Sequence, residues 1–124
     1  MSPQLLSKRE TFKEQSYFDG KAQSRQEWIE KFEAAIADPE FSSKIPFLFD
    51  YRMYKGNSPK EIIIARANYL GALQGKISST IAILVTDPLH YGLGRMLQVY
   101  TSRYGFQIEV FTSPNEALKY LSSG

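Results

Sequence analysis

The chain of 124 residues has no cysteine and a single histidine, and both scarcities exclude kinds of site. Without cysteine, a disulfide framework and a thiolate metal site are both excluded. One histidine cannot build a zinc site by itself, so only a metal site made of carboxylates stays open. We therefore predict no resident cofactor and no metal ion.

Long apolar runs are also absent, and the net charge is only +2. No stretch of about 18 apolar residues can span a membrane, and the polar start Ser2-Pro3-Gln4 lacks the apolar core of a signal peptide. The lysines and arginines are scattered among acids, which does not favour nucleic acid as a partner. The length suits one domain over residues 1–124, which we place in the cytoplasm.

A pattern that occurs three times predicts the fold. Each copy has a short apolar strand-like run, then Ser-Pro or Asp-Pro, then an amphipathic helix-like stretch. The dipeptide places a capping oxygen before a proline whose φ suits the first turn of a helix. This alternation predicts an α/β fold in which right-handed crossovers join parallel strands. The strand-like runs are residues 47–51, 81–85 and 106–111, and the dipeptides are Ser58-Pro59, Asp87-Pro88 and Ser113-Pro114.

A further helix is predicted ahead of these three copies. The capping box at residues 24–27 starts it, and Asp38-Pro39 ends it. Gly75 and Gly105 are placed to end two of the later helices in the left-handed conformation. For residues 1–23, we expect one or two edge strands, the second ending at Gly20.

Two aspartates follow neighbouring predicted strands. Asp50 and Asp87 sit at or just beyond the carboxyl ends of these strands, so both could face one crevice and bind a divalent metal or act as acid and base. The alternative is structural: Asp87 caps a helix, and Asp50 bonds loop amides or Arg52. We favour the structural role and predict no catalytic residue, because no other part of an active site accompanies the pair.

The helix that starts at Asp87-Pro88 carries two glycines in its first turns. Gly92 and Gly94 each cost up to ~1 kcal/mol relative to alanine, which indicates close approach by a ligand or another part of the backbone. His90, Arg95 and the free amides of the helix start could hold an anion. Alternatively, the glycines allow tight packing on the sheet, and His90 and Arg95 are solvated. The inward face is predicted to comprise Leu89, Leu93, Met96, Leu97 and Tyr100.

From residue 47 to residue 121, the chain resembles the bacterial STAS-type proteins grouped as SpoIIAA-like, which are related in fold to anti-sigma-factor antagonists and to lipid-binding Sec14-type domains. The resemblance implies a mixed, mostly parallel sheet of four to five strands with about four helices, largely on one face. It also implies a non-enzymatic role in binding proteins or small ligands. The residues that carry it are 47–52, 81–88, 91–96, 111 and 116–121.

Ser58 is the nearest match to a serine that the antagonists of that family phosphorylate. The family has an Asp-Ser-Ser-Gly-type turn there, whereas this chain has Lys55-Gly56-Asn57-Ser58-Pro59, and helix capping explains Ser58 without a phosphate. A phosphate at this position would still lie at a helix N-terminus, where it is electrostatically favoured. Residues 81–121 also look like the opening of a response-regulator receiver, a likeness that we attribute to shared βαβ geometry.

Our first hypothesis is a non-enzymatic binding or regulatory module that acts through a protein partner or as a homo-oligomer. The alternative is a small anionic or lipid-like ligand held at the carboxyl ends of the central strands. A metal-dependent enzyme that uses Asp50 and Asp87 is the third. Tyrosines are enriched in both pockets and interfaces, so Tyr51 and Tyr100 are secondary candidates for binding. The candidate binding residues are Asp50, Tyr54, Ser58, Asp87, His90, Tyr91, Gly92 and Arg95.

Overall fold

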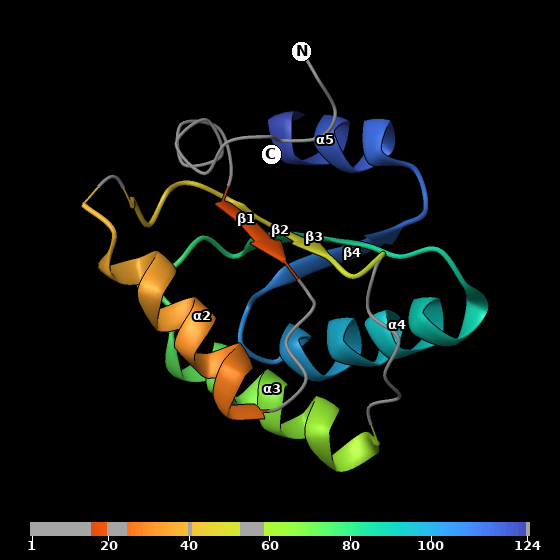
Figure 1. The fold of residues 1–124 in the computed structure, drawn as a ribbon, viewed down its shortest axis with the longest axis horizontal. Helices are drawn as coiled ribbons and strands as arrows, with labels where there is room; N and C mark the ends of the chain where they lie inside the picture. The colour runs from red at the N-terminus through yellow and green to blue at the C-terminus, as the bar shows by residue number, and fades with distance from the viewer. Residues whose placement is uncertain (1–15, 20–24, 40, 53–58, 124) are drawn as a thin grey trace.

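A computed structural model describes residues 16–19, 25–39, 41–52 and 59–123 of the chain. Strands and helices alternate through these residues, which confirms the α/β class (Figure 1). The strands are β1 (Ser16–Asp19), β2 (Phe47–Asp50), β3 (Thr80–Leu84) and β4 (Gln107–Phe111). The helices are α2 (Arg25–Ala37), α3 (Lys60–Ala72), α4 (Pro88–Ser102) and α5 (Pro114–Ser123).

The sheet has the strand order β1-β2-β3-β4, and each of its pairs is parallel. Phe47 pairs with Ile81, and Ile81 pairs with Ile108, so the predicted parallel arrangement of the last three strands is confirmed. The described strands include no antiparallel pair, and the expected mixed sheet is not seen there. The reason is that a helix connects each described strand to the next, which returns the chain in the same direction.

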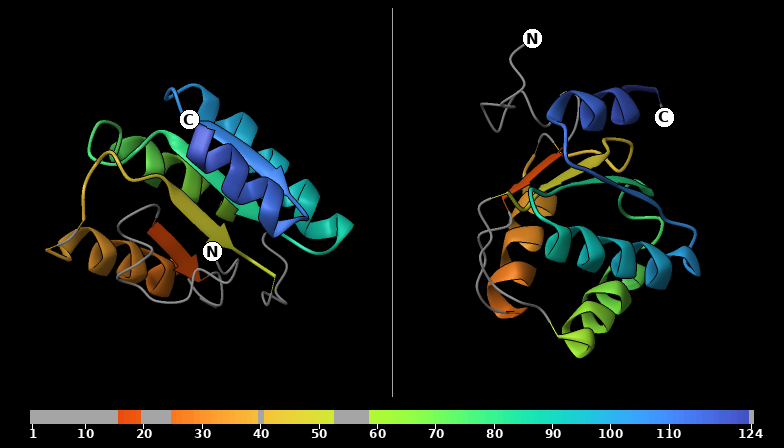
Figure 2. Two further views of the ribbon diagram at one scale, coloured as in Figure 1. Left: turned by 90° about the horizontal axis from the view of Figure 1, so that it is seen from above. Right: turned by 90° about the vertical axis from the view of Figure 1, so that its right-hand side faces the viewer.

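The helices form two layers, one on each face of the sheet. The crossover helices α2, α3 and α4 cover one face, whereas α5 lies alone on the other (Figures 1 and 2). Three successive crossovers of the same hand place their helices on the same face. The chain then turns back after β4, and this turn carries α5 to the opposite side.

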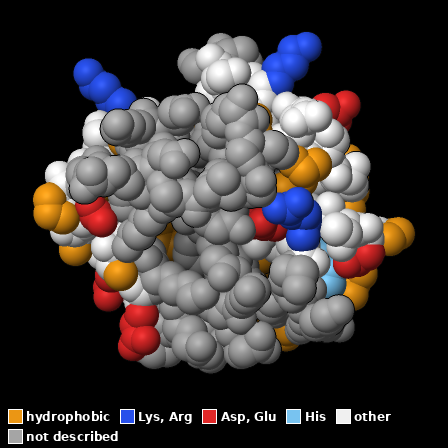
Figure 3. All heavy atoms as spheres, turned by 45° about the horizontal axis from the view of Figure 1, so that its top comes forward, with side chains coloured by type: hydrophobic (Ala, Val, Ile, Leu, Met, Phe, Trp, Pro, Cys, Tyr) orange, Lys and Arg blue, Asp and Glu red, His pale blue; other side chains and the backbone are white. Residues whose placement is uncertain are grey.

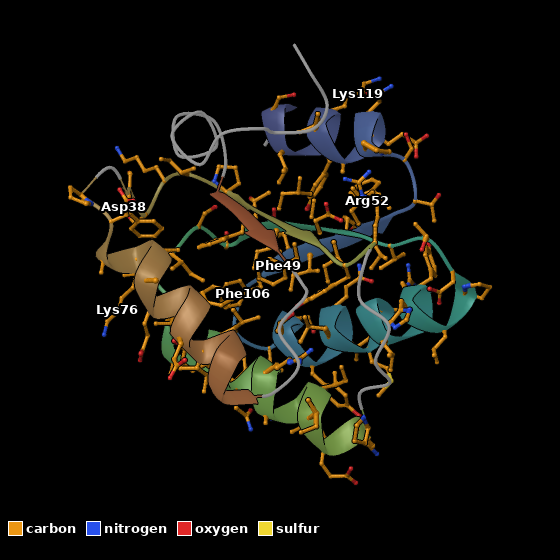
Figure 4. All side chains as sticks on the ribbon, viewed as in Figure 1. Asp38, Phe49, Arg52, Lys76, Phe106 and Lys119 are labelled. Atoms are coloured by element: carbon orange, nitrogen blue, oxygen red, sulfur yellow. The ribbon has the colours of Figure 1, made fainter. Side chains whose placement is uncertain are left out.

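Side chains alternate between the two faces along each strand, so the protein has two apolar cores. Phe49 and Phe106 lie in the layer between the sheet and α2–α4, whereas Arg52 lies on the α5 side (Figure 4). The larger core includes Phe32, Phe47, Phe49, Ile63, Leu70, Ile81, Ile83, Leu97 and Ile108. The smaller core, under α5, comprises Leu48, Ala82, Leu84, Ala117 and Leu121.

Aromatic rings join α2 to the sheet. The ring centroid of Phe32 lies 5.1 Å from that of Phe47 and 5.5 Å from that of Phe49, the second pair in an edge-to-face arrangement. Phe49 in turn lies 6.1 Å from Tyr51. Such pairs add to the free energy gained by burying the rings. The start of β2 is therefore the most aromatic part of the larger core.

The helix ends follow the predicted signals with one shift. Asp87 caps α4 through its side chain, and Gly75 and Gly105 have φ values of 85° and 81°. Helix α3 differs, because Pro59 occupies the N-cap position with ψ 162° and the first helical residue is Lys60. Proline therefore stands just before this helix rather than in its first turn. The predicted cap, Ser58, lies outside the described residues, as does the serine of the 24–27 capping box.

The inward face of α4 is rotated by about one position from the predicted one. Leu89 is 52 % exposed, so the expectation that it points inward is wrong, whereas the neighbouring His90 is buried. The buried positions are His90, Gly94, Leu97 and Thr101. Their spacing of three and four residues is that of a single helical face. Two polar residues, His90 and Thr101, therefore share a stripe with Gly94 and Leu97, and the hydrophobic pattern alone identified only Leu97.

Candidate functional site

A small cavity of about 30 Å³ lies where α3 and α4 meet the sheet. Tyr51 comes directly after β2, and His90 lies in the first turns of α4, so the cavity is near the carboxyl ends of the central strands. Ligands of open α/β sheets bind at this end of the strands. The lining residues are Tyr51, Ile63, Arg66, Ile83, His90, Leu93, Gly94 and Leu97.

Arg66 is the basic residue that α3 contributes to this lining. It is only 7 % exposed, which is rare for arginine. It lies three residues after Ile63 and four before Leu70, so it shares the inner face of α3. Sequence reasoning missed this residue. The signal was a basic side chain at a seam position of the helix, where helical spacing predicts an apolar one.

His90 is held in place by Asp87 through two hydrogen bonds. The backbone N–H of His90 donates to Oδ1 of Asp87 at 2.9 Å, and Nδ1 of the ring lies 2.6 Å from Oδ2. These bonds lower the pKa of the Asp87 carboxyl, the backbone bond having the larger effect. Because an ionised carboxylate only accepts hydrogen bonds, Nδ1 carries the proton. His90 is buried, so the expectation that it is solvated is wrong.

Replacing Asp87 tests this capping arrangement. We expect Asp87→Ala to lower the urea midpoint of unfolding, whereas Asp87→Asn keeps most of the cap, because asparagine also accepts the backbone bond. The wild type should exceed Asp87→Asn in stability above the ordinary carboxyl pKa of 3.8. This advantage should vanish as the pH falls through the lower pKa that Asp87 has in the folded state. Below that pKa, the side chain at position 87 is uncharged in both proteins. An advantage that persists at pH 2 would contradict the charge assignment.

Asp50 is the last residue of β2 and is buried on the α5 side of the sheet. It follows Leu48 of the α5-side core by two residues, and its carboxylate accepts bonds from Nε and Nη2 of Arg52 at 3.0 and 2.8 Å. The predicted structural pairing with Arg52 is confirmed. Asp87 instead caps α4, the other structural role that the sequence predicted. No group of three potential metal ligands occurs within the described part of the chain.

Of the remaining predicted residues that the structure describes, Tyr51 and Gly94 line the cavity. A Cβ atom at Gly94 would lie 3.0 Å from a methyl of Val110, so this glycine allows tight packing on the sheet. A Cβ atom at Gly92 would meet nothing within 4 Å. Tyr91 and Arg95 are exposed. Tyr54 and Ser58 lie outside the described residues, and Tyr100 packs against the larger core.

The surface seen from the α5 side carries charges of both signs. Basic and acidic side chains are interspersed over its described parts (Figure 3). This face therefore does not show the single-sign patch that a nucleic-acid surface needs. Within the described residues, no helix combines the length and the apolar character that crossing a membrane would require.

Comparison with known proteins gives no assignment. The chain matches no protein-family model, no curated protein and no solved structure. The cavity between α3 and α4 and the exposed face of α4 therefore carry the functional inference.

Proposed function

We propose that the protein is a non-enzymatic binding module that holds a small anionic ligand in the cavity between α3 and α4. One observation carries this proposal. Arg66 and His90, from two neighbouring helices, are both buried and line the same small cavity.

Electrostatics favours an anion over a neutral or cationic ligand. The lining residues include two side chains that can carry positive charge, Arg66 and His90. The described lining contains no acidic side chain. Asp87 lies behind His90 and already accepts its two bonds, so it orients the ring rather than occupying the cavity.

The side chains that line the cavity also agree with a binding role. Neither a serine nor a carboxylate is among the described lining residues, so no nucleophile is placed against His90. The STAS/SpoIIAA-like assignment remains part of the proposal and is supported by the sequence resemblance over residues 47–121.

Thermal unfolding in the presence of small anions tests the proposal. Acetate and phosphate at equal ionic strength, with chloride as the reference, should give a saturable rise in melting temperature for at least one of them. A ligand at 100 times its Kd stabilises the folded state by about 2.7 kcal/mol, which is easily measured. Equal melting temperatures in all three salts up to near-molar concentration would refute an anion site.

The second candidate is the protein-partner hypothesis, which the outer surface of α4 favours. Tyr91 is 39 % and Val99 is 65 % exposed, and both are large hydrophobic residues. Aromatic and apolar residues are enriched at the centres of interfaces. If this face joins two copies, sedimentation should depend on concentration, and Val99→Glu should abolish that dependence. A sedimentation coefficient that stays monomeric at all concentrations would exclude the homo-oligomer.

A further inference from the structure

Helix α4 carries apolar residues on the side opposite its buried positions. Leu89 is 52 % and Val99 is 65 % exposed, and Met96 between them is half-buried. Together with the exposed Gly92, they are spaced by three, four and three residues, so they lie along one side of the helix. We call these four residues the outer seam of α4. The same spacing marks the contact line between two packed helices.

Gly92 lacks a packing reason within the described structure. A Cβ atom at this position would meet nothing within 4 Å, whereas one at Gly94 would press against Val110. Glycine is disfavoured inside a helix relative to alanine, so open space alone would favour a larger residue. A glycine does, however, let another backbone come close. The exposed Gly92 therefore indicates a close contact made from outside the chain.

The charges beside the outer seam are positive. Arg95 directly precedes Met96, Arg103 follows Val99 by one turn, and both arginines are exposed. Helix α4 itself contains no aspartate and no glutamate. Neither arginine forms an ion pair with a described residue. Acidic side chains on a partner would therefore complement this surface.

Length, spacing and charge together select the occupant. At 1.5 Å per residue, the outer seam is about 15 Å long, which a partner helix of roughly three turns covers. A second copy that packed its α4 on this α4 would add arginines and supply no acid from either helix. A helix with acidic flanks supplies both the apolar line and the opposite charge.

We propose that the outer seam of α4 docks an acidic amphipathic helix of a partner protein. This inference rests on the protein-partner candidate given above. The apolar line of the partner helix packs on Leu89, Met96 and Val99, and its backbone approaches most closely at Gly92. Its acidic flanks pair with Arg95 and with Arg103.

Fluorescence anisotropy with two labelled synthetic peptides tests the proposal on the full chain. Both peptides have about three heptads with leucine at the two seam positions, and they carry either glutamate or lysine at the flanking positions. Like charges on these flanks hinder each peptide from pairing with itself. The glutamate peptide should bind at least about tenfold more tightly than the lysine peptide, which corresponds to ~1.4 kcal/mol. Added salt should reduce the difference, because it screens exposed charges.

Substitutions in the outer seam should weaken the glutamate peptide while the urea midpoint of unfolding stays near or above that of the wild type. Val99→Ser removes an exposed apolar side chain, and Gly92→Val blocks the close approach. The matched control Tyr91→Ala removes an exposed ring from the same helix, about a third of a turn away from the outer seam, and should leave the affinity unchanged. Wild-type affinity in both seam variants would contradict the docking site.

Charge reversal tests the acidic character of the partner. Arg95→Glu should weaken the glutamate peptide and strengthen the lysine peptide. Lys119→Glu makes the same change in charge on α5, on the other face of the sheet, and should do neither (Figure 4).

The outcomes separate the acidic helix from a protein partner in general. Equal affinity for the two peptides, or no binding of either, would overturn the acidic-helix assignment. If neither peptide binds but sedimentation depends on concentration and Val99→Glu abolishes that dependence, the protein-partner function stands and this inference is wrong. If the glutamate peptide does not bind and vesicles of phosphatidylcholine and phosphatidylglycerol bind through Val99, the outer seam contacts a membrane and both are wrong.

Discussion

Phe49→Ala should lower the free energy of unfolding by about 3–5 kcal/mol, the usual loss for removing a buried phenylalanine side chain. Phe49 is fully buried and contacts the rings of Phe32, Phe47 and Tyr51. The variant leaves a cavity in the part of the core that joins α2 to β2. Since the free energy of unfolding of a small domain is only about 5–15 kcal/mol, this loss is a large fraction of it.

Urea unfolding followed by far-ultraviolet circular dichroism measures this loss. Tyr91→Ala is the matched control, because it removes an aromatic ring that is 39 % exposed on the outer side of α4. Exposed substitutions of this kind change stability by only about 0.5 kcal/mol. Equal urea midpoints for the two variants would mean that Phe49 is not in the core.

Gly94→Val should destabilise the protein by about 1–3 kcal/mol, which is typical of overpacking a filled core. The first side-chain atom at this position would already lie 3.0 and 3.2 Å from the two methyl groups of Val110. A valine adds two further carbons to the same space. A methyl group of Ile83 lies 3.6 Å from the same position, so either α4 or the sheet must move to make room.

Gly92→Val is the control for this prediction, since it makes the same substitution two residues earlier in the same helix. A Cβ atom at Gly92 meets nothing within 4 Å, so only the change in helix propensity remains. Valine is somewhat better than glycine in a helix, and we expect a gain of a few tenths of a kcal/mol, that is roughly 0.3. Similar losses in both variants would show that a general helix effect, not contact with Val110, is responsible.

The order of strands and helices could be predicted because proline and glycine mark their boundaries. Asp87-Pro88 starts α4 as expected, and Gly75 and Gly105 take the predicted left-handed conformation. These signals are local, since they depend on φ and on one capping oxygen. Parallel pairing of the strands could be predicted from the crossover helices. The position of α5 could not be predicted, because nothing in its own sequence indicates which face of the sheet it covers.

The candidate site was predicted only in part, for a reason that Arg66 and Leu89 illustrate. Hydrophobicity predicts that leucine points inward and arginine outward, yet Arg66 of α3 is buried and Leu89 of α4 is exposed. Tertiary packing at the cavity decides these orientations, and no local pattern records it. The capping role of Asp87 was predicted correctly because this residue lies at a helix start, where sequence signals are strong.

The position of β3 has a consequence for local opening. This strand pairs with β2 and β4, and its side chains contribute to the cores on both faces. Detachment of α5 alone would uncover Ala82 and Leu84 but would leave Ile81 and Ile83 covered. No single opening event frees the whole strand. The slowest amide hydrogen exchange in the molecule should therefore come from β3, at rates set by global unfolding.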